Sequence, residues 1–299
     1  MSSTDNVAEA NISKPQVTTF FDAVTNTFSY VVSDPASLAC AIVDPVLNFD
    51  QASGTLSHEG ADVIVEYVRT GGLEVQWLIE THVHADHLSA GHYLQGLLGG
   101  KLMIGAGITT VQATFGEIFN AGADFRRDGS QFDRLLQDGD RYTVGSLSAY
   151  ALHTPGHTPA CMTHVIGDAI FVGDTLFMPD AGTARADFPG GDARILYRSI
   201  QRLLQLPEAY RMFMCHDYCP DGRPLSNETT VAAQRAANIH VNATKTEDEF
   251  VAVRQARDKT LGMPQLILPS LQVNMRGGVL PAAEDNGMVY LKLPVNAFV

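Results

Sequence analysis

Residues 81–87 constrain this chain more than any other stretch, because they read Thr-His-Val-His-Ala-Asp-His. They follow the apolar run of residues 75–79, which predicts a buried strand. A strand that ends in a tight turn can direct several side chains at one point. Imidazole and carboxylate together suit Zn, Fe or Mn better than Ca or Mg, which prefer shells made only of oxygen. We therefore interpret this stretch as a metal site and not as a polar surface loop, with the candidate ligands His82, His84, Asp86 and His87.

Length and charge are those of an ordinary globular protein. The chain has 299 residues, 45% of them hydrophobic and 18% charged, which is enough for one large α/β domain or two smaller ones. The formal net charge of -13 and the lack of a Lys/Arg cluster argue against a nucleic-acid partner. No apolar run approaches the roughly 18 residues of a transmembrane helix, so we expect no membrane partner.

The N-terminal residues and the cysteines predict a cytoplasmic protein. Residues 1–15 are polar and lack the basic and apolar blocks of a secretory signal. The cysteines show no spacing typical of a disulfide framework; they are Cys40, Cys161, Cys215 and Cys219. A structural role and a redox role both stay open for Cys215 and Cys219, and the sequence assigns no role to Cys161.

Apolar runs alternate with helical patterns, which predicts an α/β fold of two sheets covered by helices. The expected strands are residues 17–21, 27–32, 39–43, 75–79, 101–104, 147–152, 161–166, 169–172 and 211–214. The expected helices are residues 58–69, 88–98, 195–206, 228–238 and 247–260. Residues 112–140 indicate a helix followed by a loop-rich insertion. Because no linker composition is visible, we interpret residues 17–237 as one domain and residues 238–299 as an extension packed on it.

Three more ligand candidates follow predicted strands. His157 lies in the loop of residues 153–159, where two prolines and a glycine limit the conformations of the backbone. Asp174 follows the apolar strand at residues 169–172, and a buried acid is costly there unless a cation pairs with it. His216 follows the strand at residues 211–214. Because strand ends on one edge of a sheet converge, we expect these side chains to meet the histidine-rich stretch.

In order and spacing, the motifs resemble those of the metallo-β-lactamase superfamily over most of residues 20–237. The matching segments are Thr81-His82-x-His84-x-Asp86-His87, Gly156-His157-Thr158, Gly173-Asp174 and His216. The resemblance implies an αββα sandwich with a metal centre at one edge of the two sheets. In dinuclear members, the residues that match His82, His84 and His157 would hold one metal, those that match Asp86, His87 and His216 a second, and Asp174 would bridge them.

Further segments resemble the persulfide dioxygenases and the bacterial β-lactamase-hydrolase-like proteins of this superfamily. They are Gly182-Thr183-Ala184-Arg185-Ala186-Asp187-Phe188, residues 196–200, residues 216–218 and residues 274–278. This resemblance implies one Fe(II) per chain, held by His82, His157 and Asp174, with three coordination positions open. The other candidates, His84, Asp86, His87 and His216, would orient the ligands and water from nearby.

The activity implied is the oxidation of glutathione persulfide by O2 and water to sulfite and glutathione. Arg185 is the best candidate for binding a glutathione carboxylate, and a salt bridge with Asp187 is the alternative. Tyr218, Asn274 and Arg276 match positions near the tripeptide. Family members are often dimers, which implies a homodimer here.

Two positions outside the ligand set bear on the site. Asp44 ends the strand at residues 39–43 and is expected to support the ligands without being one. The insertion at residues 112–135 departs from the shorter family members and bears on the shape of the site mouth, not on the metal.

Two other functions also fit the sequence. A dinuclear Zn hydrolase of glyoxalase II or lactonase type would use the same seven ligands, and only the metal content separates it from the dioxygenase. A non-catalytic persulfide-binding module is the second, although such modules usually lose a ligand and this chain has lost none.

Overall fold

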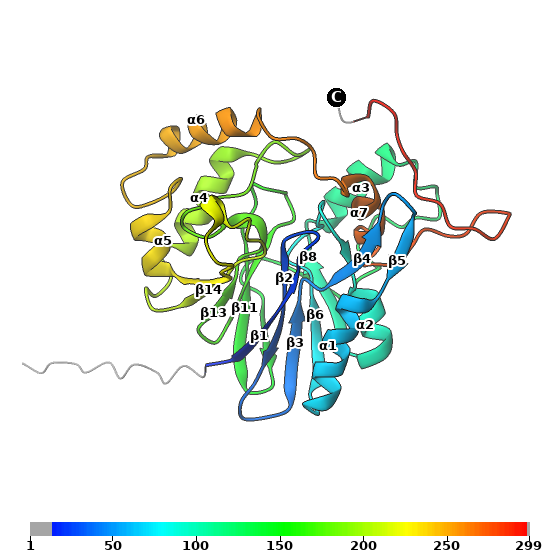
Figure 1. Ribbon diagram of the computed structural model, residues 1–299, viewed down its shortest axis with the longest axis horizontal. Coiled ribbons are helices and arrows are strands. Elements are labelled where there is room, and N and C mark those ends of the chain that lie inside the picture. Colours follow the sequence, from blue (N-terminus) through cyan, green and yellow to red (C-terminus); the bar gives the residue numbers. More distant parts are fainter. Residues whose placement is uncertain (1–13, 298–299) are drawn as a thin grey trace, which may run out of the picture.

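Two six-stranded β-sheets pack face to face in the computed structural model, which describes residues 14–297 (Figure 1). The first sheet has the order β1-β2-β3-β6-β8-β9, with β1 Gln16–Asp22, β2 Thr27–Ser33, β3 Ala39–Val43, β6 Glu74–Ile79, β8 Lys101–Gly105 and β9 Arg134–Leu136. The second runs from β10 to β15 in chain order, with β10 Arg141–Val144, β11 Leu147–His153, β12 Met162–Ile166, β13 Ala169–Phe171, β14 Arg211–Phe213 and β15 Glu228–Thr230.

Within residues 14–297, a small third sheet and seven α-helices complete the fold. The third sheet has the order β5-β4-β7, with β4 Val46–Asp50, β5 Thr55–Ser57 and β7 Leu88–Ser89. On the side of the first sheet lie α1 Glu59–Thr70, α2 Gly91–Leu98, α3 Ile108–Ile118 and α7 Ile267–Asn274. On the side of the second sheet lie α4 Ala193–Leu203, α5 Val231–Ala237 and α6 Glu247–Asp258. The predicted αββα sandwich is confirmed.

Three apolar layers hold the sandwich together. In β2, Val31 faces the helices of the first sheet, whereas Tyr30 and Val32 face the second sheet. Both faces of this strand are buried, which is why its sequence reads as a continuous apolar run and not as an alternating one. The third layer lies between the second sheet and helices α4 to α6, where Leu196 and Phe250 are buried.

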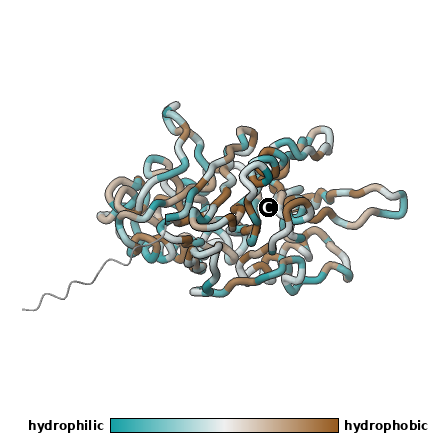
Figure 2. The backbone as a smooth tube through the Cα atoms, turned by 90° about the horizontal axis from the view of Figure 1, so that it is seen from below, coloured by the Kyte–Doolittle hydropathy of each residue, from teal (hydrophilic) through white to brown (hydrophobic). Residues whose placement is uncertain are grey.

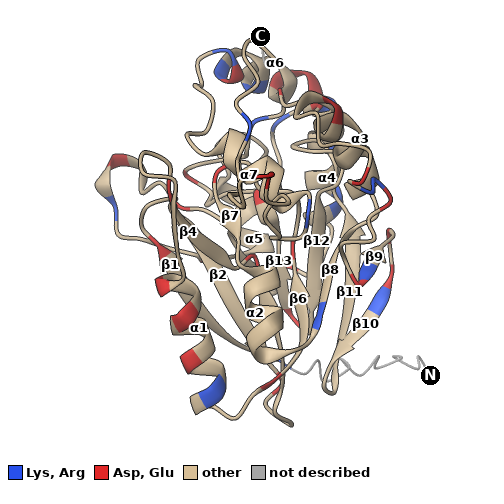
Figure 3. Ribbon diagram, turned by 90° about the vertical axis from the view of Figure 1, so that its right-hand side faces the viewer, with Lys and Arg blue, Asp and Glu red and all other residues tan. Residues whose placement is uncertain are grey.

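Helix α1 shows how sequence fixes the side that each helix buries. Its buried residues are Ala61, Ile64, Val65 and Val68, which recur at the three- and four-residue spacing of one helix face. The acidic residues of α1 lie on its outer side (Figure 3), in keeping with the acidic composition of the chain.

Several predicted element boundaries were wrong. The helix expected from residue 88 begins at Gly91, because Leu88 and Ser89 pair with β4. The helix expected from residue 228 begins at Val231, because residues 228–230 pair with β14. Both errors have the same cause: a two- or three-residue strand contributes no periodicity, and its partner lies far away in the sequence.

The C-terminal residues differ most from expectation. None of the expected helices lies after residue 260, yet α7 forms there and is largely buried. After α7, the chain extends away from the body on the right of Figures 1 and 2 and carries both hydrophobic and hydrophilic residues. The expected absence of a targeting signal concerns residues 1–15, and residues 1–13 lie outside the described residues. Within residues 14–297, every helix is too short or too polar to span a bilayer.

Candidate metal centre

All seven predicted ligands lie together at one edge of the two sheets. The histidine-rich loop of residues 81–87 follows β6, and His157 follows β11. Asp174 follows β13, and His216 follows β14, which pairs with β13 in parallel. Parallel strands release their C-terminal loops at the same edge, and this topology brings distant parts of the sequence to one centre.

The imidazoles and carboxylates are within a few ångströms of each other. Nε2 of His82 and Nε2 of His157 lie 3.9 and 3.6 Å from Oδ2 of Asp174. Nε2 of His216 lies 3.2 Å from both Oδ1 of Asp174 and Oδ2 of Asp86. The rings of His84 and His87 stand 4.1 Å apart. Ligand atoms of His82, His157 and Asp174 all fall within 4.8 Å of one another, as do those of His84, Asp86 and His87.

Buried polar atoms at this centre lack hydrogen-bond partners, and this fits a metal. Within the described residues, six such atoms belong to the predicted ligands: Nε2 of His82, Nδ1 of His84, Oδ2 of Asp86, Nε2 of His87, Oδ1 of Asp174 and Nε2 of His216. A buried polar atom without a partner is costly, so six in one place require a ligand that satisfies them together. The donor set of nitrogen and carboxylate oxygen suits Zn²⁺ or Fe(II).

The other ring nitrogen of each histidine is anchored by the protein. Nδ1 of His157 donates to the carbonyl of Arg185 at 2.8 Å, and Nε2 of His84 contacts Oδ1 of Asp44 at 2.9 Å. Nδ1 of His216 donates to the carbonyl of Asn26 at 3.2 Å. Metal-binding histidines commonly use one nitrogen in this way, which fixes the ring and leaves the other nitrogen for the metal.

Two glycines make the close approach of the ligand loops possible. Gly156 has a φ of +135°, and a Cβ there would lie 2.3 Å from Cα of Leu196 in α4. Gly173 has a φ of +52°, and its Cβ would lie 2.6 Å from Oγ1 of Thr81. Any side chain at either position would push a ligand loop outward. Steric crowding therefore explains why a glycine precedes each of these two ligands.

Electrostatics keep Asp174 ionised. Burial opposes its charge, but His216, His82 and His157 around it hold the pKa of Asp174 well below its usual range. A carboxylate buried among imidazoles is therefore ready to bind a cation without first losing a proton.

Two further buried carboxylates, those of Asp44 and Glu80, support the histidine-rich loop. Asp44 accepts hydrogen bonds from the amide and the hydroxyl of Thr81, at 2.8 and 2.9 Å, as well as contacting His84. Glu80 accepts from the hydroxyl of Ser89, and burial raises its pKa to about 8. Glu80 is not among the predicted site residues, although it shows the signal that identified Asp174, an acid at the end of a buried strand.

The structure places Asn274 beneath the histidine-rich loop. Its amide nitrogen donates to the carbonyls of His84 and His87, each at 2.8 Å, and its Oδ1 accepts from the amide of Ser89 at 2.8 Å. The side chain is 4% exposed. All its hydrogen-bonding groups are thus engaged by backbone, and the C-terminal extension becomes part of the support of the centre.

The remaining predicted substrate contacts differ in their surroundings. Arg185 forms a bidentate ion pair with Asp187, donates to the carbonyl of Gly262 and stacks on Phe188. Arg276 stacks on the ring of Phe125, 4.4 Å from its centroid. Tyr218 is 54% exposed and stacks on His216. Of the predicted contacts, Tyr218 is the one that combines exposure with a direct contact to a ligand.

The cysteines are all free thiols. Sγ of Cys215 lies within 4.8 Å of the ligand atoms of Asp174 and His216. Sγ of Cys161 contacts the hydroxyl of Thr158, the residue after His157, at 3.0 Å. Cys215 and Cys161 are therefore buried neighbours of the ligand loops.

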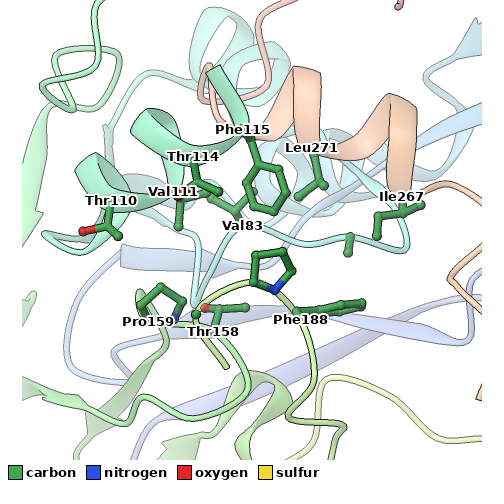
Figure 4. A pocket seen from close by; sticks show the side chains of 13 residues that line it. Val83, Thr110, Val111, Thr114, Phe115, Thr158, Pro159, Phe188, Ile267 and Leu271 are labelled. Atoms are coloured by element: carbon green, nitrogen blue, oxygen red, sulfur yellow. The ribbon is translucent and has the colours of Figure 1, made fainter. Parts of the chain in front are cut away.

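An apolar cavity of about 230 Å³ adjoins the centre (Figure 4). Val83 and Ala85 of the histidine-rich loop belong to its lining. In Figure 4, residues of α3 and α7 form the upper side of the cavity, and Thr158, Pro159 and Phe188 lie opposite them.

Comparison with known proteins identifies the family. Residues 23–216 match the profile of the metallo-beta-lactamase superfamily, a stretch that contains all seven predicted ligands. The chain belongs to the metallo-beta-lactamase superfamily.

Proteins named for different activities resemble this chain. A probable metallo-hydrolase of Burkholderia pseudomallei is 56% identical over 93% of this chain and 98% of its own length. The mitochondrial persulfide dioxygenase ETHE1 of Homo sapiens is 30% identical over 87% of both chains. The crystal structure of ETHE1 from Myxococcus xanthus has 28% identity and a TM-score of 0.70, and covers 88% of this chain and 100% of its own. The predicted superfamily and its persulfide dioxygenase relatives are thus confirmed.

Proposed function

We propose that this protein is a persulfide dioxygenase that holds one Fe(II) per chain at His82, His157 and Asp174. The observation that carries the proposal is the set of two imidazoles and one carboxylate that converge within 4.8 Å. Two histidines and one carboxylate on one face of an iron are the ligand set of non-haem oxygenases. The 30% identity with the human persulfide dioxygenase supports this reading over most of the chain.

The reaction is the oxidation of a persulfide, with glutathione persulfide as the first substrate to test. The persulfide, O2 and water give the thiol, sulfite and two protons: the S–S bond breaks, the outer sulfur is oxidised, and O2 accepts the electrons. Bound Fe(II) would supply the oxygen activation, which redox-inert Zn²⁺ does not provide.

The residues of the chain contribute positioning and charge. His157 is fixed by the carbonyl of Arg185, and Asp174 stays ionised among the imidazoles. In the proposed mononuclear centre, His84, Asp86, His87 and His216 would hold water and the reacting groups through the nitrogen and oxygen atoms that lack partners. Tyr218, which is 54% exposed and stacked on His216, would contact the substrate. Binding both reactants at one centre lowers the entropic cost of bringing them together in the reacting geometry.

The second candidate is a dinuclear Zn hydrolase of glyoxalase II or lactonase type. It is favoured by the partnerless atoms of Asp86, His87 and His216, which could hold a second metal. The relative named a probable metallo-hydrolase agrees with it.

Metal content and oxygen uptake separate the two candidates. For the dioxygenase, we expect one Fe per chain by elemental analysis and O2 uptake with glutathione persulfide in proportion to iron. Asp174→Ala should lose both the iron and the uptake, whereas Asp128→Ala, at an exposed ion pair with Arg126, should keep both. Two Zn per chain with thioester hydrolysis, or no O2 uptake by the fully iron-loaded protein, would reject the dioxygenase.

A further inference from the structure

A single guanidinium group joins two of the loops that carry predicted ligands. Arg223 donates through Nε and Nη2 to the carboxylate of Asp180, the second of these bonds at 2.8 Å. Through Nη1 and Nη2 it donates to Asp217, at 2.6 and 2.8 Å. Asp180 lies in the loop that follows Asp174, and Asp217 directly follows His216. The bridge therefore ties the loop of one predicted ligand to the loop of another.

Asp217 is the buried end of this bridge. Its side chain is 0% exposed, whereas that of Asp180 is 45% exposed. The carboxylate of Asp217 also accepts from the amide of Cys219 at 3.2 Å and from the amide of Ser226 at 2.8 Å. Because a buried carboxylate without a cation is strongly disfavoured, Arg223 determines whether Asp217 can hold both ends of this turn.

The turn that Asp217 closes has a strained backbone. Cys219 and Asp221 have φ values of +46° and +56°, in the left-handed region that favours glycine. Such residues persist only where surrounding contacts hold them in place. Arg223 supplies these contacts and also donates to the carbonyl of Pro224 at 3.0 Å. Its five hydrogen bonds use every N–H group that an arginine side chain offers.

The same two loops carry aromatic side chains that surround His216. The ring of Tyr218 is stacked on His216, with the centroids 5.9 Å apart. Phe177 meets both rings edge-on, 6.1 Å from His216 and 5.8 Å from Tyr218. Phe177 and Tyr218 each lie within three residues of an acid that Arg223 binds. The bridge thus fixes the aromatic side of the centre.

We infer that Arg223 is a positioning residue, which acts through Asp217 to hold the ring of Tyr218 against His216. The inference rests on the proposed function, in which Tyr218 would contact the persulfide. Arg223 itself would touch neither metal nor substrate, because its N–H groups are all engaged within the loops. An ion pair with a merely structural role would change stability alone, whereas a positioning role changes how tightly the substrate is held.

The first test measures O2 uptake by the iron-loaded enzyme with glutathione persulfide. Arg223→Ala should raise KM about fivefold, the ratio that loss of one ordinary hydrogen bond yields, and leave kcat and iron content unchanged. Arg223→Lys keeps the charge but not the planar fork, so its KM should lie between the two. The control, Arg235→Ala, removes an exposed pair with Glu208 and should change neither constant. An unchanged KM in Arg223→Ala overturns the inference and leaves the proposed function standing.

A double-mutant cycle shows whether Arg223 acts through Tyr218. Tyr218→Ala should raise KM by itself. Addition of Arg223→Ala should raise it no further, because the ring to be positioned is gone. If the two increases multiply, Arg223 affects the substrate by another route and the inference is rejected.

The position of Tyr218 can also be measured without turnover. Zinc-substituted protein is diamagnetic, so fluorine NMR of a sample labelled with fluorotyrosine records each tyrosine ring. The Tyr218 signal, identified by its loss in Tyr218→Phe, should shift in Arg223→Ala and stay in place in Arg235→Ala. If Arg223→Ala does not fold, the same comparison is made with Arg223→Lys.

The two measurements separate the inference from the proposed function. If glutathione persulfide causes no O2 uptake by fully iron-loaded protein but the Tyr218 signal shifts, the proposed function fails and the hold of Arg223 on Tyr218 stands. An unshifted signal overturns the inference, whatever the uptake.

Discussion

Asn274 illustrates how one side chain can support a metal centre without being a ligand. It holds the carbonyls of His84 and His87 and the amide of Ser89, and thereby fixes the turn from which three histidines project. Groups that orient metal ligands commonly matter nearly as much as the ligands themselves.

Replacement of Asn274 should therefore weaken metal binding. We expect Asn274→Ala to reduce metal affinity roughly 10- to 100-fold, by analogy with other residues that support ligands. Asn274→Asp preserves the shape but cannot donate to the two carbonyls, so it should lose affinity as well. The measurement is competition with a chelator of known affinity.

Asn286→Ala is the control, because this exposed residue of the C-terminal segment bonds only within that segment. If Asn274→Asp binds metal as tightly as the unchanged chain, the donated hydrogen bonds do not support the centre.

Helix α6 is connected to the centre through a buried ion pair. Arg254 is 1% exposed, pairs with Asp258 and donates to the carbonyl of Thr183 at 2.8 Å. Asp258 in turn accepts from the amide of Ala186. These contacts hold the segment around Arg185, whose carbonyl anchors His157.

Loss of Arg254 should destabilise the protein and loosen the centre. Arg254→Ala leaves Asp258 buried without its partner, which typically costs about 3 kcal/mol or more in the free energy of unfolding. Arg194→Ala removes two exposed pairs between α4 and α6, leaves the pair of Arg198 with Glu247, and should change stability little. Urea unfolding of both variants, with metal content measured alongside, checks this; equal losses would contradict it.

The turn between β2 and β3 links the two sheets through Asp34. Its carboxylate accepts hydrogen bonds from the amide and hydroxyl of Ser146, which lies between β10 and β11. Burial opposes ionisation, but these bonds and those from Ala36 and Ser37 prevail and lower the pKa of Asp34 to about 2.

This lowered pKa predicts a pH-dependent contribution to stability. Because the folded-state pKa lies below the ordinary value, the contribution is complete above pH 4 and is lost as the pH falls through about 2. At pH 7, Asp34→Asn should cost about 1 to 2 kcal/mol, after allowance for solvent screening. The difference in unfolding free energy, measured on metal-free protein at several pH values, should shrink between pH 4 and pH 2. A constant difference would contradict this assignment.

At the scale of the whole molecule, the metal centre lies where loops from both sheets meet. Ligands come from both sheets, and their partnerless atoms remain a cost to the fold until a cation satisfies them. Binding of a metal to the folded state alone must raise stability by mass action.

Metal removal should therefore lower the melting temperature. At a free metal concentration about 100 times the dissociation constant, the gain is about 2.7 kcal/mol, which corresponds to roughly 4 °C for a chain of 299 residues. Differential scanning calorimetry before and after chelation measures it, and restoring the metal should restore the transition. An unchanged melting temperature in a sample shown to lose its metal would mean that the seven side chains do not bind it in the folded state.

The sequence by itself indicated the seven candidate ligands, two sheets covered by helices and most of the long elements, and its resemblance to a known family implied the αββα sandwich. His82, His157 and Asp174 could be named as candidates because each follows an apolar strand, and this pattern of neighbouring residues is visible in the sequence. Helix α1 could be predicted because its apolar residues recur at the spacing of one helix face. These are properties of neighbouring residues.

Only the tertiary structure decided the rest. Asn274 lies 190 residues from His84, and the contact that makes it a support depends on where α7 packs. The hydrogen bonds of Gln112 to Met275 and Gly129 likewise form where distant segments meet. The same holds for the contact of Arg185 with Gly262 and for the apolar cavity. Sequence pattern carries local periodicity, whereas the partners of a buried polar group and the walls of a cavity are set by long-range packing, which no local pattern encodes.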